Sequence, residues 1–271
     1  MCALGDLLLD VIVRLSRRLA PGDDVPAATH VRAGGQAANV AAWAAALGGR
    51  GRFLGKRAED AAGALVGAEV VRHGVELRGP VVSGRTGVVV SIVDVAGERT
   101  MASDRGVAPE LRCEEVEADW LAGARTLHVS GYSLAAEPIA AAAERAVELA
   151  HGRGLQVSVD VSAATLVDGR FRERLERLRP DVLFATEAER EALGDELPAS
   201  TWVLKRGAQG CVFSQNGVFV DLPATEAEAV DSTGAGDALA AGFLLGGALD
   251  EAARRAMRAA ARCVSKLGAM P

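Results

Sequence analysis

The stretch DSTGAGD, residues 231 to 237, places an aspartate and two glycines directly before an apolar run that predicts a helix. Gly234 and Gly236 let the backbone approach a ligand closely, because they lack a Cβ. The residues from Ala235 onward open the predicted helix, and because the first N–H groups of a helix have no partner within it, they are suited to bind an anion. A carboxylate beside that site, Asp237, is placed to accept a proton from a hydroxyl group attacking a phosphoryl group. The alternative is that Asp237 only balances the partial positive charge at the helix N-terminus. The flanking glycines together with Asp231 favour the role in proton transfer.

A second glycine-rich stretch, GGQAANVA, runs from Gly34 to Ala41 and leads into a segment that predicts a helix ending at Gly48-Gly49. Neither stretch is a Walker A loop, and Leu239 occupies the third-glycine position of a dinucleotide fingerprint. The four histidines show no HxH or HExxH spacing, which disfavours a histidine metal site. GYSLA, residues 131 to 135, lacks the closing glycine of a hydrolase nucleophile elbow.

Composition places the chain among globular proteins and excludes several classes of partner. It has 271 residues, 49% hydrophobic and 24% charged, with no apolar run long enough to span a membrane. The net charge of −6 argues against binding to nucleic acid or to an anionic membrane. The N-terminus lacks the basic segment of a signal peptide, and the four cysteines show neither CxxC nor metal-ligand spacing. We therefore expect a cytoplasmic protein with reduced thiols.

The hydrophobic pattern predicts strands alternating with helices, and hence an α/β fold with a mostly parallel central sheet covered on both faces. The residues from Cys2 to Val13 predict one strand buried on both faces. The other expected strands are 127–132, 155–161, 181–186 and 201–207, followed by a hairpin that turns at Asn216-Gly217. The expected helices are 137–151, 187–193, 235–245 and 250–266, and residues 171–179 predict an amphipathic helix.

Two β-rich stretches do not fit this alternation. The first is residues 11–33, in which residues 14–32 are polar and interrupted by Pro21, Gly22 and Pro26. The second is residues 85–104, which are rich in Val and Thr with a turn at Ala96-Gly97. We interpret them as one small sheet built from discontinuous segments, which forms a lid within a single domain spanning residues 1–271. Arg105, where the predicted hairpin returns to the core, is interpreted as a surface arginine, with contact to a substrate anion as the alternative.

These motifs resemble those of the ribokinase-like (PfkB) family of carbohydrate and nucleoside kinases. DSTGAGD is similar to the C-terminal signature of that family, GGQAANVA to its N-terminal signature, and GDLLLD, residues 5–10, to its opening strand. The resemblance covers essentially the whole chain and implies a three-layer α/β/α fold. It implies an ATP-dependent kinase with Asp237 as the general base and the amides of Gly234, Ala235 and Gly236 binding the transferred phosphoryl group.

The resemblance also implies which residues bind the substrates. Sugar hydroxyls would be bound by Asp10, Gly34, Gly35 and Asn39. The loop LKRGAQG would bind the nucleotide through Lys205, Gly207 and Gly210, although a solvated Lys205 is the alternative. The last helix would form one wall of the adenine pocket with Ala260, Cys263 and Val264, residues that could equally be ordinary core.

Some residues depart from the family pattern where metal ions are expected. Glu189 matches the acid of a motif that organises Mg²⁺ and phosphates through water, but Thr186 stands where the family has Asn. Asp231 and Thr233 are candidates for a monovalent-cation site, and the short C-terminus leaves its other wall incomplete. The sequence therefore predicts Mg²⁺ and does not predict dependence on K⁺. Val161 replaces a proline frequent in relatives, which suggests a different loop near the phosphates.

We interpret the chain as an ATP-dependent kinase of a small sugar of the ribose, fructose or keto-deoxy sugar acid type. Pairing of two lid sheets makes a homodimer plausible. One alternative is a nucleoside kinase, which the absence of aromatic residues from 11–32 and 85–104 disfavours. The other is a non-catalytic sugar- or nucleotide-binding regulator, which has no need of a base at position 237. The sequence fixes neither the sugar nor the oligomeric state.

Overall fold

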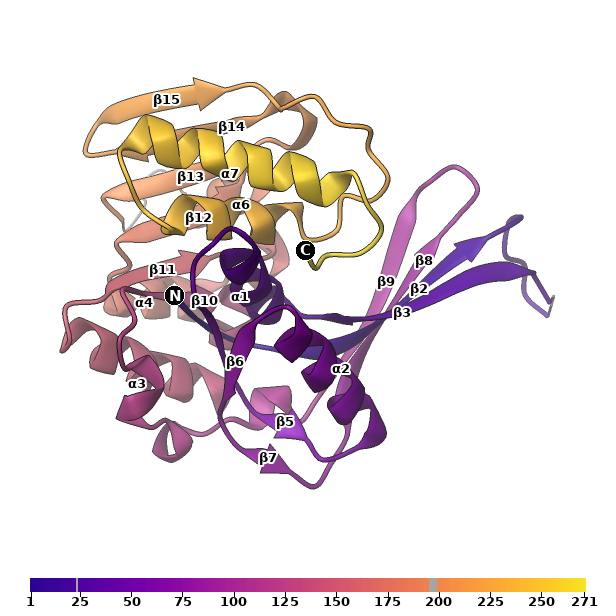
Figure 1. Ribbon diagram of the computed structural model, residues 1–271, viewed down its shortest axis with the longest axis horizontal. Helices are drawn as coiled ribbons and strands as arrows, with labels where there is room; N and C mark the ends of the chain where they lie inside the picture. Colours follow the sequence, from indigo (N-terminus) through magenta and orange to yellow (C-terminus); the bar gives the residue numbers. More distant parts are fainter. Residues whose placement is uncertain (23, 195–198) are drawn as a thin grey trace.

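The computed structural model describes residues 1–22, 24–194 and 199–271, so Asp23 of the expected lid segment lies outside the described residues. Its centre is a nine-stranded sheet in the order β15-β14-β13-β12-β11-β10-β1-β4-β6 (Figure 1). Neighbouring strands from β13 to β6 are parallel, whereas β14 and β15 are antiparallel. The strands are β1 (Cys2–Leu4), β4 (Gly51–Leu54), β6 (Val75–Arg78), β10 (Thr126–Ser130), β11 (Gln156–Asp160), β12 (Val182–Thr186), β13 (Thr201–Lys205), β14 (Cys211–Gln215) and β15 (Val218–Leu222).

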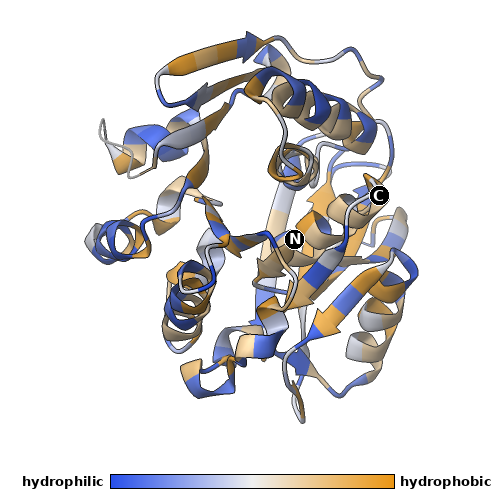
Figure 2. Ribbon diagram, turned by 60° about the vertical axis from the view of Figure 1, so that its left-hand side comes forward, coloured by the Kyte–Doolittle hydropathy of each residue, from blue (hydrophilic) through white to orange (hydrophobic). Residues whose placement is uncertain are grey.

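Helices cover both faces of this sheet, which confirms the predicted three-layer α/β/α fold. One face packs against α1 (Gln36–Ala46), α2 (Ala61–Arg72), α6 (Ala235–Leu244) and α7 (Leu249–Val264). The other face packs against α3 (Ile139–His151), α4 (Gly169–Leu178) and α5 (Glu187–Leu193). The strands are therefore apolar on both faces, as parallel strands under two helical layers must be (Figure 2).

The helices around the N-terminus of α6 pack closely because their facing residues are small. α1 and α6 pack against each other, and both contain runs of fully buried alanines, among them Ala38, Ala41 and Ala241. At the contact between α6 and α7, a Cβ added to Gly242 would lie 2.8 Å from the Cα of Ala256. Small side chains thus compensate for the scarcity of aromatic residues in the core, because they let the helix backbones approach one another.

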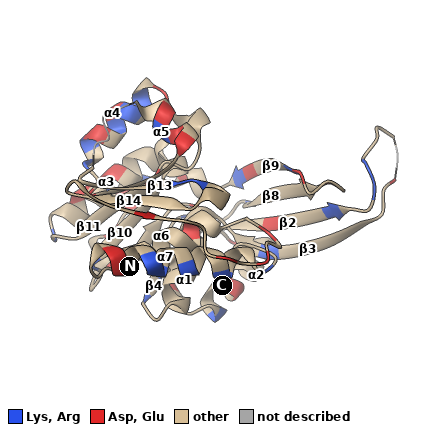
Figure 3. Ribbon diagram, turned by 90° about the horizontal axis from the view of Figure 1, so that it is seen from above, with Lys and Arg blue, Asp and Glu red and all other residues tan. Residues whose placement is uncertain are grey.

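A second sheet, in the order β3-β2-β8-β9, projects from the α/β body (Figures 1 and 3). It consists of β2 (Leu8–Leu15), β3 (Ala27–Gly34), β8 (Thr86–Val93) and β9 (Arg99–Gly106). β2 pairs with β3 antiparallel and with β8 in parallel, and β8 pairs with β9 antiparallel. Two segments distant in the sequence therefore form this sheet, which we call the lid sheet, and each extends slightly beyond the expected ranges.

The prediction of one strand from Cys2 to Val13 is wrong. The chain forms β1 in the central sheet, leaves it at Gly5 to Leu7, and continues as β2 in the lid sheet. The acid Asp6 explains the break: its buried carboxylate accepts hydrogen bonds of 2.6 and 2.9 Å from the Arg105 guanidinium at the base of β9. The interpretation of Arg105 as a surface arginine is therefore also wrong, because it joins the lid sheet to the core.

The sequence pattern did not reveal the unit formed by β4, α2 and β6, nor the short pair β5 (Arg57–Ala58) and β7 (Val81–Val82). The strands of this unit are short, and α2 exposes Leu65 and Val71, so its apolar pattern is weak. The hairpin at Asn216-Gly217 is confirmed, with φ values of 50° and 80° at its two turn residues. These positive angles match the right-handed twist of a tight hairpin.

Candidate functional site

The N-terminus of α6 lies at the edge of the central sheet where the parallel strands end. Gly234 is its N-cap, with φ 76°, and a Cβ there would lie 2.5 Å from the Cβ of Ala269. The N–H of Ala235 donates to the carbonyl of Ser232 at 3.3 Å, so one of the three amides expected to bind an anion already has a partner. The first-turn amides of Gly236 and Asp237 have no acceptor within the helix and remain available.

Asp237 is buried in the first turn of α6, with 9% of its surface exposed. Its Oδ2 accepts a hydrogen bond of 2.7 Å from the Asn39 side chain on α1, which fixes the orientation of the carboxylate. Burial raises the pKa of Asp237 to about 7, and the charges of Asp160 and Asp10 act in the same direction. The Asn39 hydrogen bond and the charge of Lys205 oppose this shift. A carboxylate with such a pKa is suited to exchange a proton near neutral pH.

The two glycines before α1 make room for the carboxylate of Asp10 on β2. A Cβ on Gly34 would lie 2.1 Å from the Asp10 Oδ2, and one on Gly35 would lie 2.4 Å from the Asp6 carbonyl oxygen. Gly35 is also the N-cap of α1, with φ 97°. Burial raises the pKa of Asp10 to about 7, helped by Asp231, while Arg99 lowers it. Gly34 thus leaves room for the Asp10 carboxylate, whose charge acts on Asp237, and Asp237 in turn is bonded to Asn39.

A charged cluster lies on the other side of Asp237, at the ends of β11, β12 and β13. The Nζ of Lys205 donates to the Asp160 Oδ2 at 2.7 Å and lies 4.0 Å from the Glu189 Oε2. A Cβ on Gly236 would lie 3.7 Å from this Nζ, so the ammonium group is beside the free amides of α6. Burial alone would lower the pKa of Lys205, but Asp160 and Glu189 outweigh it and raise that pKa. Lys205 is therefore a buried cation, and the alternative of a solvated lysine is wrong.

Thr186 and Glu189, the pair predicted to organise Mg²⁺ through water, form a capping box at the start of α5. The Thr186 hydroxyl accepts from the Glu189 N–H at 3.3 Å, and the Glu189 Oε2 accepts from the Thr186 N–H at 2.7 Å. The T-x-x-E spacing is a known signature of this cap. Burial raises the pKa of Glu189, while Lys205 lowers it. The other carboxylate oxygen of Glu189, Oε1, takes no part in the cap.

Asp231, predicted with Thr233 for a monovalent cation, faces a cation from the lid sheet. Its Oδ1 accepts from the Thr233 N–H at 2.9 Å and from the Thr233 hydroxyl at 2.6 Å, and its Oδ2 accepts from the Gly268 N–H at 3.0 Å. The Arg99 guanidinium lies 3.8 Å from the Asp231 Oδ1 and contacts the Thr233 hydroxyl. Burial would raise the pKa of Asp231, but these hydrogen bonds outweigh it and hold that pKa below its usual value.

The residues predicted for the adenine pocket lie at the end of α7 and pack under the loop that precedes α6. The Cys263 thiol donates to the Thr233 carbonyl at 3.3 Å, and the Val264 carbonyl accepts from the Val230 N–H at 2.8 Å. Ala260 packs at the edge of the core. The predicted nucleotide loop forms a turn after β13, with Gly207 at φ 56° and Gly210 at φ 100°. Of these residues, Cys263 and Val264 support the loop that leads into the anion site.

Sequence reasoning missed Tyr132, which lies in the helical turn Gly131–Leu134 that follows β10. Its side chain is 39% exposed, and burial raises its pKa together with the charges of Glu189, Asp160 and Asp237. The charges of these carboxylates therefore act on its hydroxyl group, and the Arg105 guanidinium lies 6.0 Å from the centre of its ring. Its position at the end of a central strand was the only signal that could have singled it out.

Two further findings concern the residues that the structure describes. No helix among them is long and apolar enough to cross a membrane. Within residues 1–22, 24–194 and 199–271, no group of His, Cys, Asp or Glu side chains is arranged as a set of three or more metal ligands.

Comparison with known proteins gives consistent matches over the whole chain. The family described as pfkB family carbohydrate kinase matches residues 1–271. The ATP-dependent ribose-1-phosphate kinase of Halopiger xanaduensis is 31% identical over 271 residues, covering 96% of this chain and 88% of that protein. Fructokinase-1 of Zea mays is 29% identical over 233 residues, a match that covers 78% of this chain and 72% of that protein. The adenosine kinase structure from Sinorhizobium meliloti superposes with a TM-score of 0.88 at 26% identity, covering 100% of this chain and 95% of that one.

Proposed function

Because this chain belongs to the pfkB family of carbohydrate kinases, we propose that it transfers the γ-phosphoryl group of ATP to a hydroxyl group of a small sugar, with Asp237 as the general base. The observation that carries this proposal is the buried Asp237 carboxylate, oriented by Asn39 beside the free amides at the N-terminus of α6. A carboxylate there would repel a resting phosphate. Its presence is accounted for by proton transfer from the acceptor hydroxyl.

The transfer is a single in-line displacement. The acceptor oxygen forms a bond to the γ-phosphorus, the bond from that phosphorus to the β,γ-bridging oxygen breaks, and ADP leaves with the electron pair. The hydroxyl proton passes to the Asp237 carboxylate. The amides of Gly236 and Asp237 and the Lys205 ammonium oppose the charge on the transferred group. Because the transition state is loose, positioning and electrostatics contribute more than base catalysis.

The donor set near Lys205 fits Mg²⁺ held mainly through water and phosphate oxygens. Asp160 and Glu189 offer carboxylate oxygens on either side of the ammonium group, and Mg²⁺ in kinases needs only one or two protein carboxylates. Bound there, Mg²⁺ would neutralise phosphate charge and orient the leaving group. Thr186 contributes its hydroxyl to the helix cap and would affect the metal only through Glu189.

The acceptor is proposed to be a sugar of the ribose, fructose or keto-deoxy sugar acid type. Asp10 and Asn39 offer the acceptors and donors that neighbouring hydroxyl groups require. A nucleoside is the second candidate, because Tyr132 is a 39% exposed aromatic residue on which a base could stack, with the Arg105 guanidinium 6.0 Å from the centre of its ring. The buried base at position 237 argues against a non-catalytic regulator, which gains nothing from a carboxylate there.

We also propose that a second copy of the chain covers the outer face of the lid sheet. That face presents Val11, Val31, Val90 and Ile92, and Val31 is 42% exposed. Analytical ultracentrifugation should show a dimer at micromolar concentrations, and Val31→Lys should shift the species to a monomer. A monomeric wild-type chain would contradict this proposal.

Release of ADP with MgATP over a panel of acceptors tests the proposed function. The panel contains pentoses, hexoses, their monophosphates, keto-deoxy sugar acids and nucleosides. We expect at least one sugar or sugar derivative to give turnover well above the ATPase background. Turnover with nucleosides alone would favour the second candidate, and no turnover with any acceptor would contradict the kinase proposal.

A further inference from the structure

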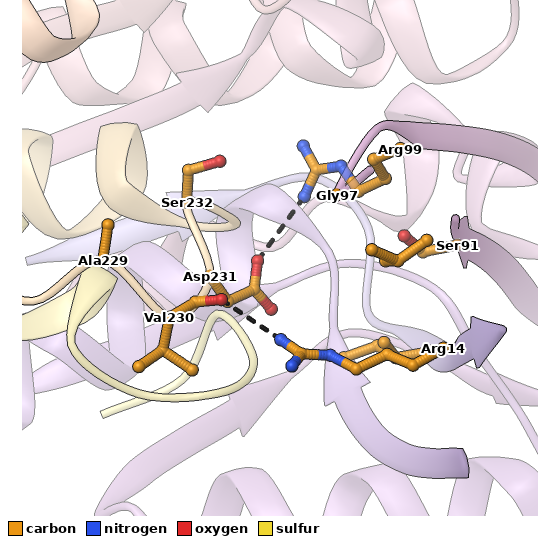
Figure 4. A pocket seen from close by; sticks show the side chains of 10 residues that line it. Arg14, Ser91, Gly97, Arg99, Ala229, Val230, Asp231 and Ser232 are labelled. Carbon is orange, nitrogen blue, oxygen red and sulfur yellow. Dashed lines mark hydrogen bonds and ion pairs between the residues drawn. The ribbon is translucent and has the colours of Figure 1, made fainter. Parts of the chain in front are cut away.

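A cavity of about 210 Å³ lies between the inner face of the lid sheet and the loop that precedes α6. The lid sheet contributes Arg14 and Arg99, and the loop contributes Val230 and Asp231 (Figure 4). In the sheet, Arg14 on β2 and Arg99 on β9 both pair with Val93 of β8 and therefore stand in one row. Figure 4 shows the guanidinium groups of Arg14 and Arg99 both directed toward this loop.

The positive charges of these two arginines are not both balanced by carboxylates. The Arg14 Nη2 donates to the Val230 carbonyl at 3.1 Å, while its Nε is buried without a hydrogen-bond partner in the described structure. No carboxylate of the described residues forms an ion pair with Arg14, and Arg99 has Asp231 at 3.8 Å. The Asp231 carboxylate already accepts three hydrogen bonds from Thr233 and Gly268. The cavity thus holds an excess of positive charge and an unused donor.

The cavity continues the predicted sugar site along β2. Asp10, Ile12 and Arg14 alternate on the same face of this strand, and Ile12 lines the cavity between the other two. At about 3.3 Å per residue, the Cα atoms of Asp10 and Arg14 are about 13 Å apart. The arginine side chain is long, so the distance between the Asp10 carboxylate and the Arg14 guanidinium can be shorter than this. A sugar held by Asp10 and Asp237 can therefore extend a substituent toward the arginines. The nucleotide-side cation, Lys205, is on the other side of Asp237.

We propose that this cavity binds a phosphate group of the acceptor, so that the substrate is a sugar monophosphate and the product is a sugar bisphosphate. This inference rests on the proposed kinase function. Two planar guanidinium forks match the oxygens of a phosphate dianion, whereas a single carboxylate needs only one of them. The buried Arg14 Nε gains its missing acceptor when the phosphate is bound. A neutral sugar leaves that donor unpaired, which selects against it.

The test compares acceptors with and without a phosphate group. With ribose, ribose 1-phosphate, ribose 5-phosphate, fructose, fructose 1-phosphate and fructose 6-phosphate, we expect the best monophosphate to exceed its parent sugar in kcat/KM by about 100-fold or more. Equal turnover of the parent sugar overturns the inference and leaves the kinase function standing. A preference for a keto-deoxy sugar acid likewise overturns the phosphate assignment.

Substitution of the arginines separates the acceptor phosphate from the phosphates of ATP. Arg14→Gln and Arg99→Gln should each raise the KM for the sugar monophosphate by about 10- to 100-fold, with the KM for ATP unchanged. The matched control is Arg85→Gln, because Arg85 is a lid arginine that is 80% exposed and lies outside the cavity. A rise in the KM for ATP instead would assign the cavity to the nucleotide and overturn the inference.

Calorimetric titration of the same monophosphates without ATP tests the cavity even if no acceptor is turned over. Binding that is lost in Arg14→Gln and kept in Arg85→Gln supports the inference. Absence of binding to the wild-type protein overturns it. Thermal melting of each variant verifies that the lid substitutions leave the fold intact.

Discussion

The two sides of Asp237 differ in how their charges are arranged. On the nucleotide side, Lys205 stands between Asp160 and Glu189, and all of them come from the ends of central strands or the helix that follows. On the acceptor side, Asp10, Arg14 and Arg99 come from the lid sheet, and the arginines retain an unpaired donor. The charges on the proposed nucleotide side are therefore compensated within the core, whereas we expect those on the proposed acceptor side to be compensated by the ligand.

This difference explains how one fold can keep its chemistry and vary its acceptor. The central sheet fixes Asp160, Glu189 and Lys205 relative to one another, because each lies at or just after the end of an inner strand buried on both faces, and the N-terminus of α6 packs beside them. The lid sheet contacts the body through α2, the Asp6–Arg105 ion pair, and the bonds of Arg14 and Arg99 to the loop that precedes α6. Changes in the lid sheet should alter which acceptor binds and leave phosphoryl transfer intact. The predictions below test each side in turn.

The largest effect is expected at Asp237, where the two sides meet. Asp237→Asn should lower turnover by about 10²–10⁴-fold, the usual contribution of a general base, while ATP binding measured by calorimetry is unchanged. Asp250→Asn, which removes an exposed carboxylate at the start of α7, is the matched control.

Thermal melting separates this loss from misfolding. Because the pKa of Asp237 is raised to about 7, its ionisation costs folding stability as the pH rises from its unfolded-state pKa toward 7. The asparagine carries no such cost, so the variant should melt no lower than wild type at pH 8. Unchanged turnover in Asp237→Asn would contradict its role as base.

The next largest effect is expected at the anion site. Gly234→Ala introduces a Cβ 2.5 Å from the Cβ of Ala269 at a residue with φ 76°, and should displace the amides of the first turn. Loss of such donors typically lowers kcat by about 10²–10³-fold. Gly246→Ala is the matched control, since Gly246 also has a positive φ, 82°, but open space around its Cβ position. Equal activities of the two variants would show that the anion site is not where we place it.

A smaller effect is expected at the nucleotide-side cation. Lys205→Met should leave Asp160 buried and unpaired, which typically destabilises a protein by about 3–5 kcal/mol. The double variant Lys205→Met/Asp160→Asn should recover the melting temperature. Its KM for ATP should stay elevated by about 10-fold or more, because the ammonium group no longer meets a phosphate. Full recovery of the KM in the double variant would assign Lys205 a structural role only.

The sequence predicted those parts of the site that are encoded locally. The glycines at 34, 35, 234 and 236 mark close backbone approaches, and the structure gives a contact or a positive φ for each of the first three. Asp10 and Asn39 were placed through the resemblance of their motifs. The T-x-x-E spacing at Thr186 was read as a metal motif, although the same letters are the signature of a helix cap.

What the sequence could not predict depends on pairings between distant segments. Arg105 meets Asp6 only because β9 returns beside the end of β1, and Arg14 meets Arg99 only through the register of three lid strands. Neither register is encoded by a local motif. The break between β1 and β2 at Asp6 could not be predicted for the same reason, because the Asp6 carboxylate pairs with Arg105, which lies 99 residues further along the chain.

The pH dependence of kcat/KM for the acceptor tests the central claim most directly, because it reports the ionisation of the essential base in the free enzyme. Asp237 acts only when ionised, so activity should fall as the pH drops through about 7. Asp10 also has a pKa of about 7, and Asp10→Asn distinguishes the two carboxylates. In that variant the acid limb should persist at a lower overall rate and move to lower pH, because the charge of Asp10 no longer raises the pKa of Asp237. A profile that is flat from pH 5 to 9 in the wild type, or an acid limb that disappears in Asp10→Asn, would contradict the assignment of Asp237 as the base.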